Sequence, residues 1–572
     1  MEQENKAFKM MSGRMTFVLA SVFVLFLGLI ARIVYLQTLM HEQLVSEGEN
    51  RFERVLKFSA QRGNILDRNG QILSTSTPVD SLAANPLVFC QNRDRWQELA
   101  MTLAVEVEHF HERCKLYREA RFMYLLRQIP PELAEQAIDI GVPGLEVRRE
   151  YKRFFPGGPI GAQLIGLTNV DDIGQEGLEL KYDDQLTGEE GVQRVLKDRT
   201  GRYVEAIDNP RSVRHGSDLQ ISIDQRIQSL AFRYLEDAVK THKAAGGSIV
   251  LLKIPSGEII SMVNAPQFNP NDRTTVTQGV LRNRVVTDAI EPGSLTKPFT
   301  IAMLLEEGRV NPETVVDTDP GQMYIGRNRI SDVRNYGELT VTDIIAKSSN
   351  VGTVKLALEE PFEKLHRTLG RVGFGYAASD LPGESAGFLP IRKRQIEHAT
   401  MSFGYGFSAT ALQIARAYTV FATDGILLPI TINPKPAGFV ATGKRVFSTK
   451  TAVQIRQMLH KVATSQGTAS KAQISGYGVG GKTGTTHKLV NGNYKNKDYI
   501  SLFAGFGPIS NPKFVGVVII DEPRSEQYFG GAVAAPVFSN LMEDVMRIYD
   551  IRPDDLKTLI SDNTPLTEGS MG

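Results

Sequence analysis

Cysteine is scarce in this chain, and its charges are balanced. Among 572 residues only Cys90 and Cys114 are cysteines, too few to favour a metal site or a thiol nucleophile. A disulfide between them is permitted in an exported segment, but nothing in the sequence places the two side by side. Lysine and arginine number 65 against 64 aspartates and glutamates, so no basic excess points to a nucleic-acid partner. We expect no cofactor and no metal.

Long apolar runs are equally few, and the one that stands out is N-terminal. Residues 15–31 are uncharged, and residues 15–36 are long enough to span a bilayer as one helix. Three basic residues precede this run within residues 1–14, whereas residues 37–50 contain neither lysine nor arginine. This asymmetry predicts a cytoplasmic N-terminus and an exported remainder. A cleaved signal peptide is the alternative, but its apolar run would be shorter and would end in small residues, not near bulky Tyr35.

The remainder of the chain is long enough for two domains outside the membrane. Its first part is rich in glycine, proline and turns, whereas the part after Gly216 contains clear strands and amphipathic helices. The predicted parts are a cytoplasmic tail over 1–14, a transmembrane helix over 15–36, a non-catalytic domain over 37–216, a catalytic domain over 217–550 and a polar tail over 551–572.

Turn and cap signals predict several elements of these domains. Asn69-Gly70 between apolar runs indicates a hairpin, and Asp224 is a typical N-cap for a helix that reaches about residue 243. An antiparallel sheet packed by helices is the economical architecture for the second domain. Its expected strands are 218–223, 247–253, 258–263, 480–486, 499–506 and 514–520, with a helix-rich region over 294–423; helices near 95–118 and 130–140 and strands near 145–155 are expected in the first domain.

Three short strings stand in order across the second domain: Ser294-Leu295-Thr296-Lys297, Ser348-Ser349-Asn350 and Lys482-Thr483-Gly484. Each alone is a weak signal, because a serine and a lysine three apart recur by chance. Two imitations are discarded. Ser510-Asn511-Pro512-Lys513 is a turn that cannot be helical, and Ser561-Asp562-Asn563 lies in the polar tail after the third string.

The first string can supply a nucleophile and its base. Ser294 follows the turn Glu291-Pro292-Gly293 and is expected in the first turn of a helix, where free N–H groups favour a developing anion. Lys297 lies one turn along on the same face. A lysine accepts a serine proton only if burial or another cation lowers its pKa, and Lys482 is the candidate cation. An isolated pair of this kind more often lies on a solvated helix.

The other two strings can relay protons and bind substrate. Ser348 could relay a proton and Asn350 could bind a substrate amide, although helix N-capping explains that string equally well when it stands alone. Lys482 lies in a glycine-rich strand suited to bind an extended peptide at a sheet edge. The N–H groups of Ser294 and Thr485 would make an oxyanion hole, and the hydroxyls of Thr483 and Thr485 with Lys482 could hold a carboxylate.

Taken jointly, the three strings resemble the SxxK, SxN and KTG motifs of the penicillin-recognising serine acyltransferases. The single anchor and the large non-catalytic domain make the chain similar to a class B penicillin-binding protein, and the resemblance covers nearly its whole length. The pedestal motif of that family is matched by residues 62–70, 175–179 and 186–188. Strings such as Glu291-Pro292-Gly293-Ser294 and residues 528–538 resemble the septal, cell-division member of Gram-negative bacteria.

The resemblance implies a mixed α+β fold, with an elongated pedestal over 37–216 and a transpeptidase domain over 217–550. It implies a peptidoglycan D,D-transpeptidase in which Ser294 attacks the penultimate D-Ala of a stem pentapeptide, releases D-Ala and passes the acyl group to a neighbouring stem. Lys297, Ser348, Asn350 and Lys482 complete the implied catalytic set, with Thr483, Gly484 and Thr485 binding substrate. β-Lactams would trap Ser294.

The implied surroundings are the inner membrane, a separate lipid-linked glycan-strand polymerase and other division proteins. The alternatives are a serine β-lactamase, a D,D-carboxypeptidase, and a non-catalytic scaffold of a division complex.

The chain departs from the septal enzymes after Lys482-Thr483-Gly484-Thr485, where Thr486-His487-Lys488 replaces alanine and basic residues. Because histidine titrates near neutrality, His487 is a candidate pH modulator of the enzyme's activity. The simpler alternative is that His487 is a solvent-facing side chain with no such role. Ala409-Thr410-Ala411 also departs slightly, with no function attached.

Overall fold

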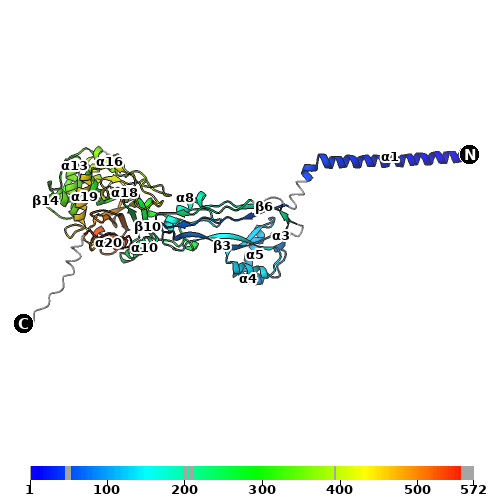
Figure 1. The fold of residues 1–572 in the computed structure, drawn as a ribbon, viewed down its shortest axis with the longest axis horizontal. Coiled ribbons are helices and arrows are strands. Elements are labelled where there is room, and N and C mark those ends of the chain that lie inside the picture. The colour runs from blue at the N-terminus through cyan, green and yellow to red at the C-terminus, as the bar shows by residue number, and fades with distance from the viewer. Residues whose placement is uncertain are drawn as a thin grey trace, which may run out of the picture. The chain divides into compact units, whose positions relative to one another are not determined.

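The computed structural model describes residues 2–44, 53–197, 203–206, 211–391, 394–490 and 493–554. By its contacts the chain divides into two units, one of residues 1–60 with 188–215 and one of residues 61–187 with 216–572. The first contains the helix α1 (Glu2–Thr38), of which residues 14–38 are long and apolar enough to cross a membrane (Figure 1). It also contains an antiparallel sheet of β1 (Glu53–Phe58), β6 (Gly191–Lys197) and β7 (Tyr203–Ala206).

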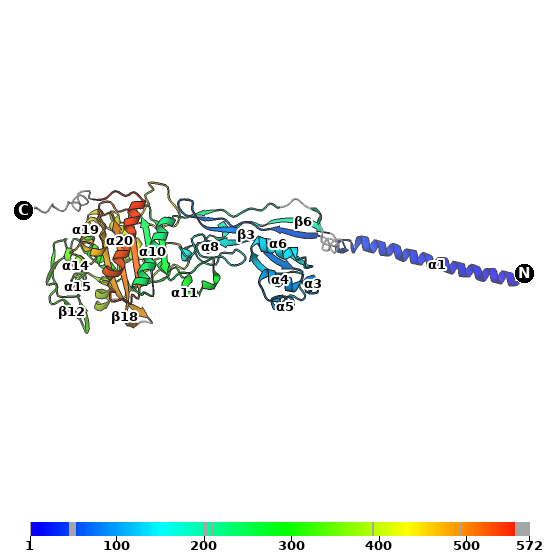
Figure 2. The ribbon, with the colours of Figure 1, turned by 90° about the horizontal axis from the view of Figure 1, so that it is seen from below.

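The second unit begins with the sheet of the pedestal. Its strands follow the order β4-β3-β2-β8, and β5 pairs along β3. The hairpin predicted at Asn69-Gly70 is confirmed, with Gly70 at a φ of 80° between β2 and β3. Small helices pack beside β3 (Figure 2). The elements are β2 (Ile65–Leu66), β3 (Ile72–Ala84), α3 (Pro86–Phe89), α4 (Trp96–Leu103), α5 (Val107–Leu116), β4 (Met123–Ile129), α6 (Pro131–Asp139), β5 (Leu145–Phe154), α7 (Ala162–Ile165), α8 (Gly177–Lys181), α9 (Asp183–Leu186) and β8 (Leu219–Gln220).

A disulfide joins Cys90 and Cys114, a pairing that the sequence permitted but did not predict. The two sulfurs close the small helical region α3 to α5, with 24 residues of separation along the chain. Trp96 packs there against Phe89 and Phe110, with ring centroids 5.1 and 5.7 Å apart. This aromatic cluster brings the end of α3 against α5, and that proximity exists only in the folded chain.

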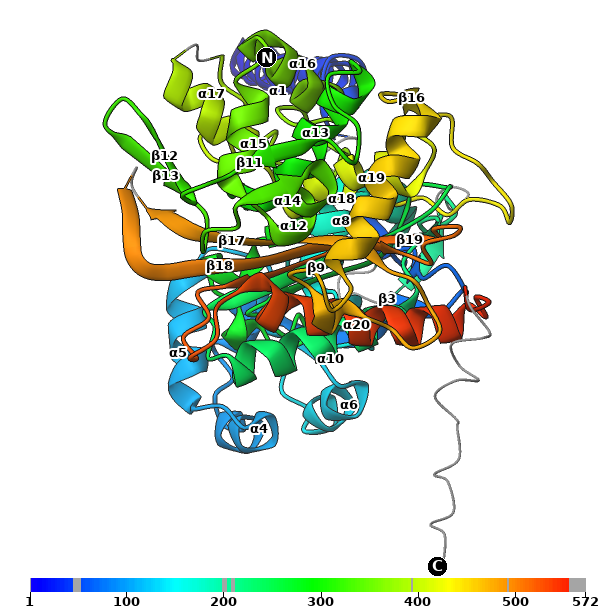
Figure 3. The ribbon, with the colours of Figure 1, turned by 90° about the vertical axis from the view of Figure 1, so that its left-hand side faces the viewer.

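A five-stranded antiparallel sheet organises the second domain, so the predicted architecture is confirmed. Its order is β10-β9-β19-β18-β17, so β17 lies at one edge. The strand predicted at 218–223 is not part of this sheet: it is only β8, Leu219–Gln220, which pairs with β2 in the sheet of the pedestal. The helices α10 and α20 cover one face, and α18 (Ala411–Ala422) and α19 (Thr449–Val462) lie on the other (Figure 3). The predicted cap on α10 is confirmed, because the Asp224 carboxylate accepts the Arg226 N–H. These elements are α10 (Gln225–Thr241), β9 (Gly246–Lys253), β10 (Glu258–Ala265), β17 (Gly480–Val490), β18 (Asn493–Gly507), β19 (Phe514–Asp521) and α20 (Gly530–Ile548).

The helix-rich region predicted over 294–423 is confirmed by α13 to α18. Thr410 and Gln413 form a capping box at the start of α18. The elements are α11 (Gln278–Leu281), α12 (Arg284–Thr287), α13 (Lys297–Glu306), β11 (Val315–Asp317), β12 (Gln322–Ile325), β13 (Asn328–Ser331), β14 (Glu338–Thr340), α14 (Val341–Lys347), α15 (Asn350–Ala357), α16 (Phe362–Arg371), α17 (Gln395–Ser402), α18 (Ala411–Ala422), β15 (Ile426–Leu427), β16 (Lys444–Arg445) and α19 (Thr449–Val462).

Two segments, 510–513 and 561–563, resemble the motifs in sequence but were not predicted to belong to the site, and only the first lies within the described residues. Ser510 lies in the loop between β18 and β19, where its hydroxyl contacts the Asp554 carboxylate, so the predicted turn is confirmed. Ser561-Asp562-Asn563 lies outside the described residues. The predicted limits of the domains stay predictions.

Candidate active site

Ser294 lies in a tight 3-10 turn, η2 (Gly293–Thr296), immediately before α13. Ser294 was predicted in the first turn of the helix, but it lies in the short 3-10 turn that precedes α13, and Lys297 is the first residue of α13. Gly293 explains the turn, because its φ is +53° and an added Cβ would lie 2.4 Å from Cγ2 of Thr486. Only glycine lets the Ser294 turn approach β17 so closely.

Lys297 is fully buried, with 0% of its surface exposed. Its Nζ donates to the Ser348 carbonyl at 2.6 Å and to the Ser348 hydroxyl at 3.2 Å. Burial lowers the pKa of Lys297 to about 7, and the negative charge of Asp332 opposes that change. The amine is therefore close to the balance between its charged and neutral forms at neutral pH.

Lys482 approaches the same hydroxyl from β17. It too is fully buried, and its Nζ donates to Ser348 Oγ at 2.8 Å and to the Thr483 carbonyl at 3.1 Å. Burial, and then the charge of Lys297, lower the pKa of Lys482 well below its ordinary value. Within the described ranges neither lysine has a carboxylate at ion-pair distance. Lys482 thus shares the Ser348 hydroxyl with Lys297, but burial lowers the pKa of Lys297, not the charge of Lys482 as predicted, and it is the pKa of Lys482 that the charge of Lys297 lowers.

Ser348 occupies a strained position between the two lysines. It ends α14 in the left-handed conformation, with φ 61° and ψ 42°, which is uncommon for a residue other than glycine. Its hydroxyl oxygen has two lone pairs, and the Nζ atoms of both lysines lie within hydrogen-bond distance of it. A hydroxyl placed between two amines is suited to pass a proton from one to the other.

Asp332 holds the strained turn in place. Its carboxylate accepts the Ser349 hydroxyl at 2.6 Å, the Val351 N–H at 3.0 Å and the Asn350 N–H. The sequence left open that this motif only caps a helix. Ser349 is indeed the N-cap of α15, whereas Ser348 is not, so capping explains Ser349 alone. The Asn350 amide donates to the Ser331 carbonyl at 2.9 Å.

β17 is the edge strand that the glycines of the third motif predicted. Gly484 lies close to the Ser294 turn, since an added Cβ would lie 3.2 Å from the Pro292 carbonyl. The Thr483 hydroxyl is 2.9 Å from that of Thr468, and the Thr485 hydroxyl accepts the Gly530 N–H at 3.0 Å. Both hydroxyls predicted to hold a carboxylate thus already have partners in the fold.

His487 lies further along β17. Its ring is 4.6 Å from the ring of Tyr499, which stacks on Tyr528 at 4.2 Å. The side chain is half-buried against this stack, so it does not simply face solvent. Its suggested role in pH dependence stays a hypothesis.

The three motifs come together in the fold. The turn that contains Ser294 lies against the edge strand β17, and two buried lysines share the Ser348 hydroxyl. The region matches the family described as the penicillin binding protein transpeptidase domain over residues 247–543, and residues 57–221 match the penicillin-binding protein dimerisation domain.

The chain belongs to the penicillin-binding protein family. It is 40% identical over 560 residues to the probable peptidoglycan D,D-transpeptidase PenA of Neisseria meningitidis, covering 97% of this chain and 96% of that protein. It is also 40% identical over 543 residues to the peptidoglycan D,D-transpeptidase FtsI of Escherichia coli, covering 93% and 91%. The prediction of a class B penicillin-binding protein is confirmed.

Solved structures agree with this assignment. The TP domain of penicillin-binding protein 3 from Burkholderia pseudomallei is 40% identical, with a TM-score of 0.54, covering 59% of this chain and 98% of that one. A peptidoglycan synthetase from Bifidobacterium adolescentis, 21% identical, has a TM-score of 0.69 and covers 88% and 98%. The second likeness shows the fold alone, and it extends over both domains of this penicillin-binding protein.

Residues that touch the motifs were missed by sequence reasoning, and Asp332, Thr468 and Gly530 are examples. Asp332 lies 17 residues before Ser349, Thr468 lies 15 before Thr483, and Gly530 lies 45 after Thr485. No local pattern marks them, because each meets its motif only through the tertiary fold. Among the described residues there is no group of three or more His, Cys, Asp or Glu that could hold a metal ion.

Proposed function

We propose that this penicillin-binding protein is a peptidoglycan D,D-transpeptidase that works through an acyl-enzyme on Ser294. Its relatives in Neisseria and Escherichia carry that activity in their names. The main support for these catalytic roles is the position of the Ser348 hydroxyl, which lies 3.2 Å from Lys297 Nζ and 2.8 Å from Lys482 Nζ. Such an arrangement suits proton transfer on both sides of an acyl intermediate.

In the first half of the reaction Ser294 Oγ bonds to the penultimate D-Ala carbonyl carbon. Lys297, as the neutral amine, accepts the hydroxyl proton. The negative charge that develops on the carbonyl oxygen is placed between the N–H groups of Ser294 and Thr485. When the peptide bond breaks, Ser348 passes a proton from the lysines to the departing D-Ala nitrogen.

In the second half an amine of a neighbouring stem peptide attacks the acyl-enzyme. The amine loses a proton along the same path in reverse, a new peptide bond forms, and Ser294 Oγ regains its proton. The edge of β17 at Thr483, Gly484 and Thr485 binds the extended donor stem by main-chain hydrogen bonds, and Asn350 binds its amide. β-Lactams acylate Ser294 in the same way.

The setting of the enzyme is part of the proposal. The basic residues before the apolar run favour a single-pass anchor in the inner membrane with its N-terminus in the cytoplasm. The likeness to FtsI suggests work in septal synthesis with a lipid-linked glycan-strand polymerase and other division proteins. A reporter that is active only outside the cytoplasm, fused after residue 554, tests the orientation; an inactive reporter contradicts it.

Labelling with a fluorescent penicillin tests the catalytic assignment. The purified chain is incubated with the probe beside Ser294→Ala, and the adduct is mapped by peptide mass. We expect a lasting adduct on Ser294 that the variant lacks. Absence of any adduct would favour a scaffold of the division complex, and release of the adduct within minutes would favour a β-lactamase. Release of D-Ala from a pentapeptide with no cross-linked product, when an amine acceptor is supplied, would favour a D,D-carboxypeptidase.

A further inference from the structure

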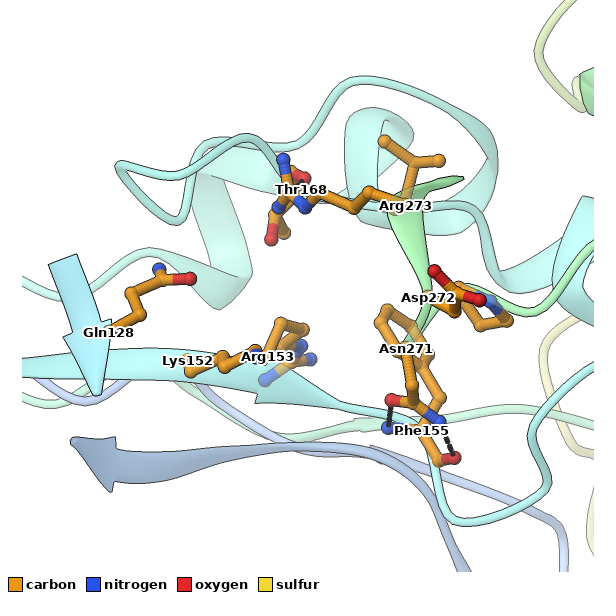
Figure 4. A pocket seen from close by; sticks show the side chains of 10 residues that line it. Gln128, Lys152, Arg153, Phe155, Thr168, Asn271, Asp272 and Arg273 are labelled. Carbon is orange, nitrogen blue, oxygen red and sulfur yellow. Dashed lines mark hydrogen bonds between the residues drawn. The ribbon is translucent and has the colours of Figure 1, made fainter. Parts of the chain in front are cut away.

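A cavity of about 370 Å³ lies where the pedestal meets the transpeptidase domain, away from the three motifs. β5 and the loop after β10 form its walls. Figure 4 shows Lys152 and Arg153 on β5, with Thr168 and Arg273 across from them and Asp272 to one side. None of its lining residues belongs to the catalytic motifs.

Direct hydrogen bonds between the two domains hold these walls together. The Asn271 amide donates to the Phe155 carbonyl at 2.8 Å, and the Phe155 N–H donates back to Asn271 at 3.0 Å (Figure 4). Arg273 donates to the Thr168 carbonyl at 2.8 Å. The cavity is therefore formed by the fold itself and needs no ligand to shape it.

The charged groups of the lining are mostly cationic. Lys152, Arg153 and Arg273 carry three positive charges, and Asp272 carries one negative charge. One oxygen of the Asp272 carboxylate accepts the N–H and the hydroxyl of Thr274, at 3.0 and 2.7 Å. In the described part of the chain Lys152 has no ion pair. Glu179, just behind the lining, already pairs with Arg153, so the remaining charges are Lys152 and Arg273 against Asp272, and an anion would meet one net positive charge.

Arg153 adds a second and independent observation. Only 2% of its side chain is exposed, its Nε donates to Glu179 at 2.7 Å and its Nη1 to Ser76 at 3.0 Å. Its Nη2 is buried and has no hydrogen-bond partner among the described residues. A buried N–H without an acceptor is costly, so such a group marks a place for a missing ligand or water.

Two acidic groups, Glu179 and Asp172, face this arginine from other elements. Glu179 is shared with Arg62, which donates to it at 2.8 Å and to Asp183 at 2.6 Å. Asp172 is half-buried nearby, and its buried Oδ1 also has no hydrogen-bond partner among the described residues, so a water bridging Asp172 and Arg153 is the competing explanation. That explanation gives no role to the exposed cation Lys152, whereas Arg273 also donates to the Thr168 carbonyl.

We propose that this cavity binds an oxyanion, a carboxylate or a phosphate group, with Arg153 at its base and Lys152 and Arg273 at its rim. An anion held there would link the pedestal to the transpeptidase domain and would stabilise the folded chain in proportion to its occupancy. Carboxylates are supplied by the peptide stems of the cell wall and phosphates by lipid carriers or the medium, so the test separates the two sources.

Calorimetric titration of the full chain in detergent tests the proposal. The two probes are inorganic phosphate and a stem tripeptide that lacks both D-Ala residues, each at millimolar concentration. Lys152→Gln removes a rim charge without removing a hydrogen bond of the fold, and Lys115→Gln on α5 is the matched control, since Lys115 is also exposed and has no ion pair among the described residues. Asp272→Asn removes the opposing charge and keeps an oxygen to accept from Thr274.

We expect saturable binding that Lys152→Gln weakens about fivefold, that Asp272→Asn strengthens by a similar factor, and that Lys115→Gln leaves unchanged. Binding of phosphate alone would assign the site to phosphoryl groups, and binding of the tripeptide alone would assign it to stem carboxylates. The proposal is overturned if neither probe binds, as expected for a bridging water. It is also overturned if Lys152→Gln weakens binding no more than the control Lys115→Gln does.

Discussion

Acylation of Ser294 should accelerate as the pH rises through 7, because the reaction needs Lys297 as a neutral amine. Burial lowers the pKa of Lys297 to about 7 from an ordinary 10.5. Below that pKa the group is an ammonium, which cannot accept the serine proton, so the rate follows the deprotonated fraction. For a pKa of about 7 that fraction is about 3% at pH 5.5 and about 76% at pH 7.5, so we expect a rise of about 25-fold.

The measurement is the second-order rate constant for acylation by a fluorescent penicillin with no group that titrates in this range. The full chain in detergent is measured at several values between pH 5.5 and 8.5, at constant ionic strength. His487→Gln is the control, because an imidazole can also change charge in this interval. Melting temperatures at each pH show whether a change in rate reflects loss of the fold.

Three outcomes are distinguishable. The same rise in the parent and in His487→Gln supports Lys297 as the base and rejects His487 as a pH modulator. A rise that His487→Gln removes would assign the dependence to the histidine. A flat profile, or a rate that increases toward acid, would refute the reasoning from the buried lysine.

Three further predictions concern residues around the site and the pedestal. Asp332→Asn should slow acylation about 10- to 100-fold with little change in melting temperature, because a charged acceptor of several hydrogen bonds is lost from the Ser348 turn; parental kinetics would contradict this. Replacing Cys90 and Cys114 by serine should lower the free energy of unfolding of the pedestal by about 3 kcal/mol, measured by denaturant unfolding, and an unchanged midpoint would show that the disulfide, with its 24-residue separation, adds no stability. Gly293→Ala should abolish penicillin labelling, because the new Cβ would lie 2.4 Å from a β17 side chain, whereas Gly308→Ala, also at positive φ but with open space around it, should label normally; equal labelling would mean that the turn adapts.

Local signals predicted the elements whose causes are local. Asn69-Gly70 formed its hairpin and Asp224 its helix cap, because a turn or a cap depends on a few neighbouring residues. The three motifs are also a property of order and residue type, and the family they indicated is the one to which the chain belongs. By contrast, the pairing of Cys90 with Cys114 depends on an aromatic cluster that only the folded pedestal assembles.

The sequence by itself determined which chemical groups are available: a serine, two lysines, a second hydroxyl and a glycine-rich strand. The tertiary structure decided what those groups can do. Lys297 and Lys482 have lowered pKa values because both are fully buried, and burial is created by residues distant in the chain. Asp332 fixes the Ser348 turn from another hairpin. The closeness of these groups and the burial of the two lysines arise from packing between segments far apart in sequence, so they cannot be predicted from a motif alone.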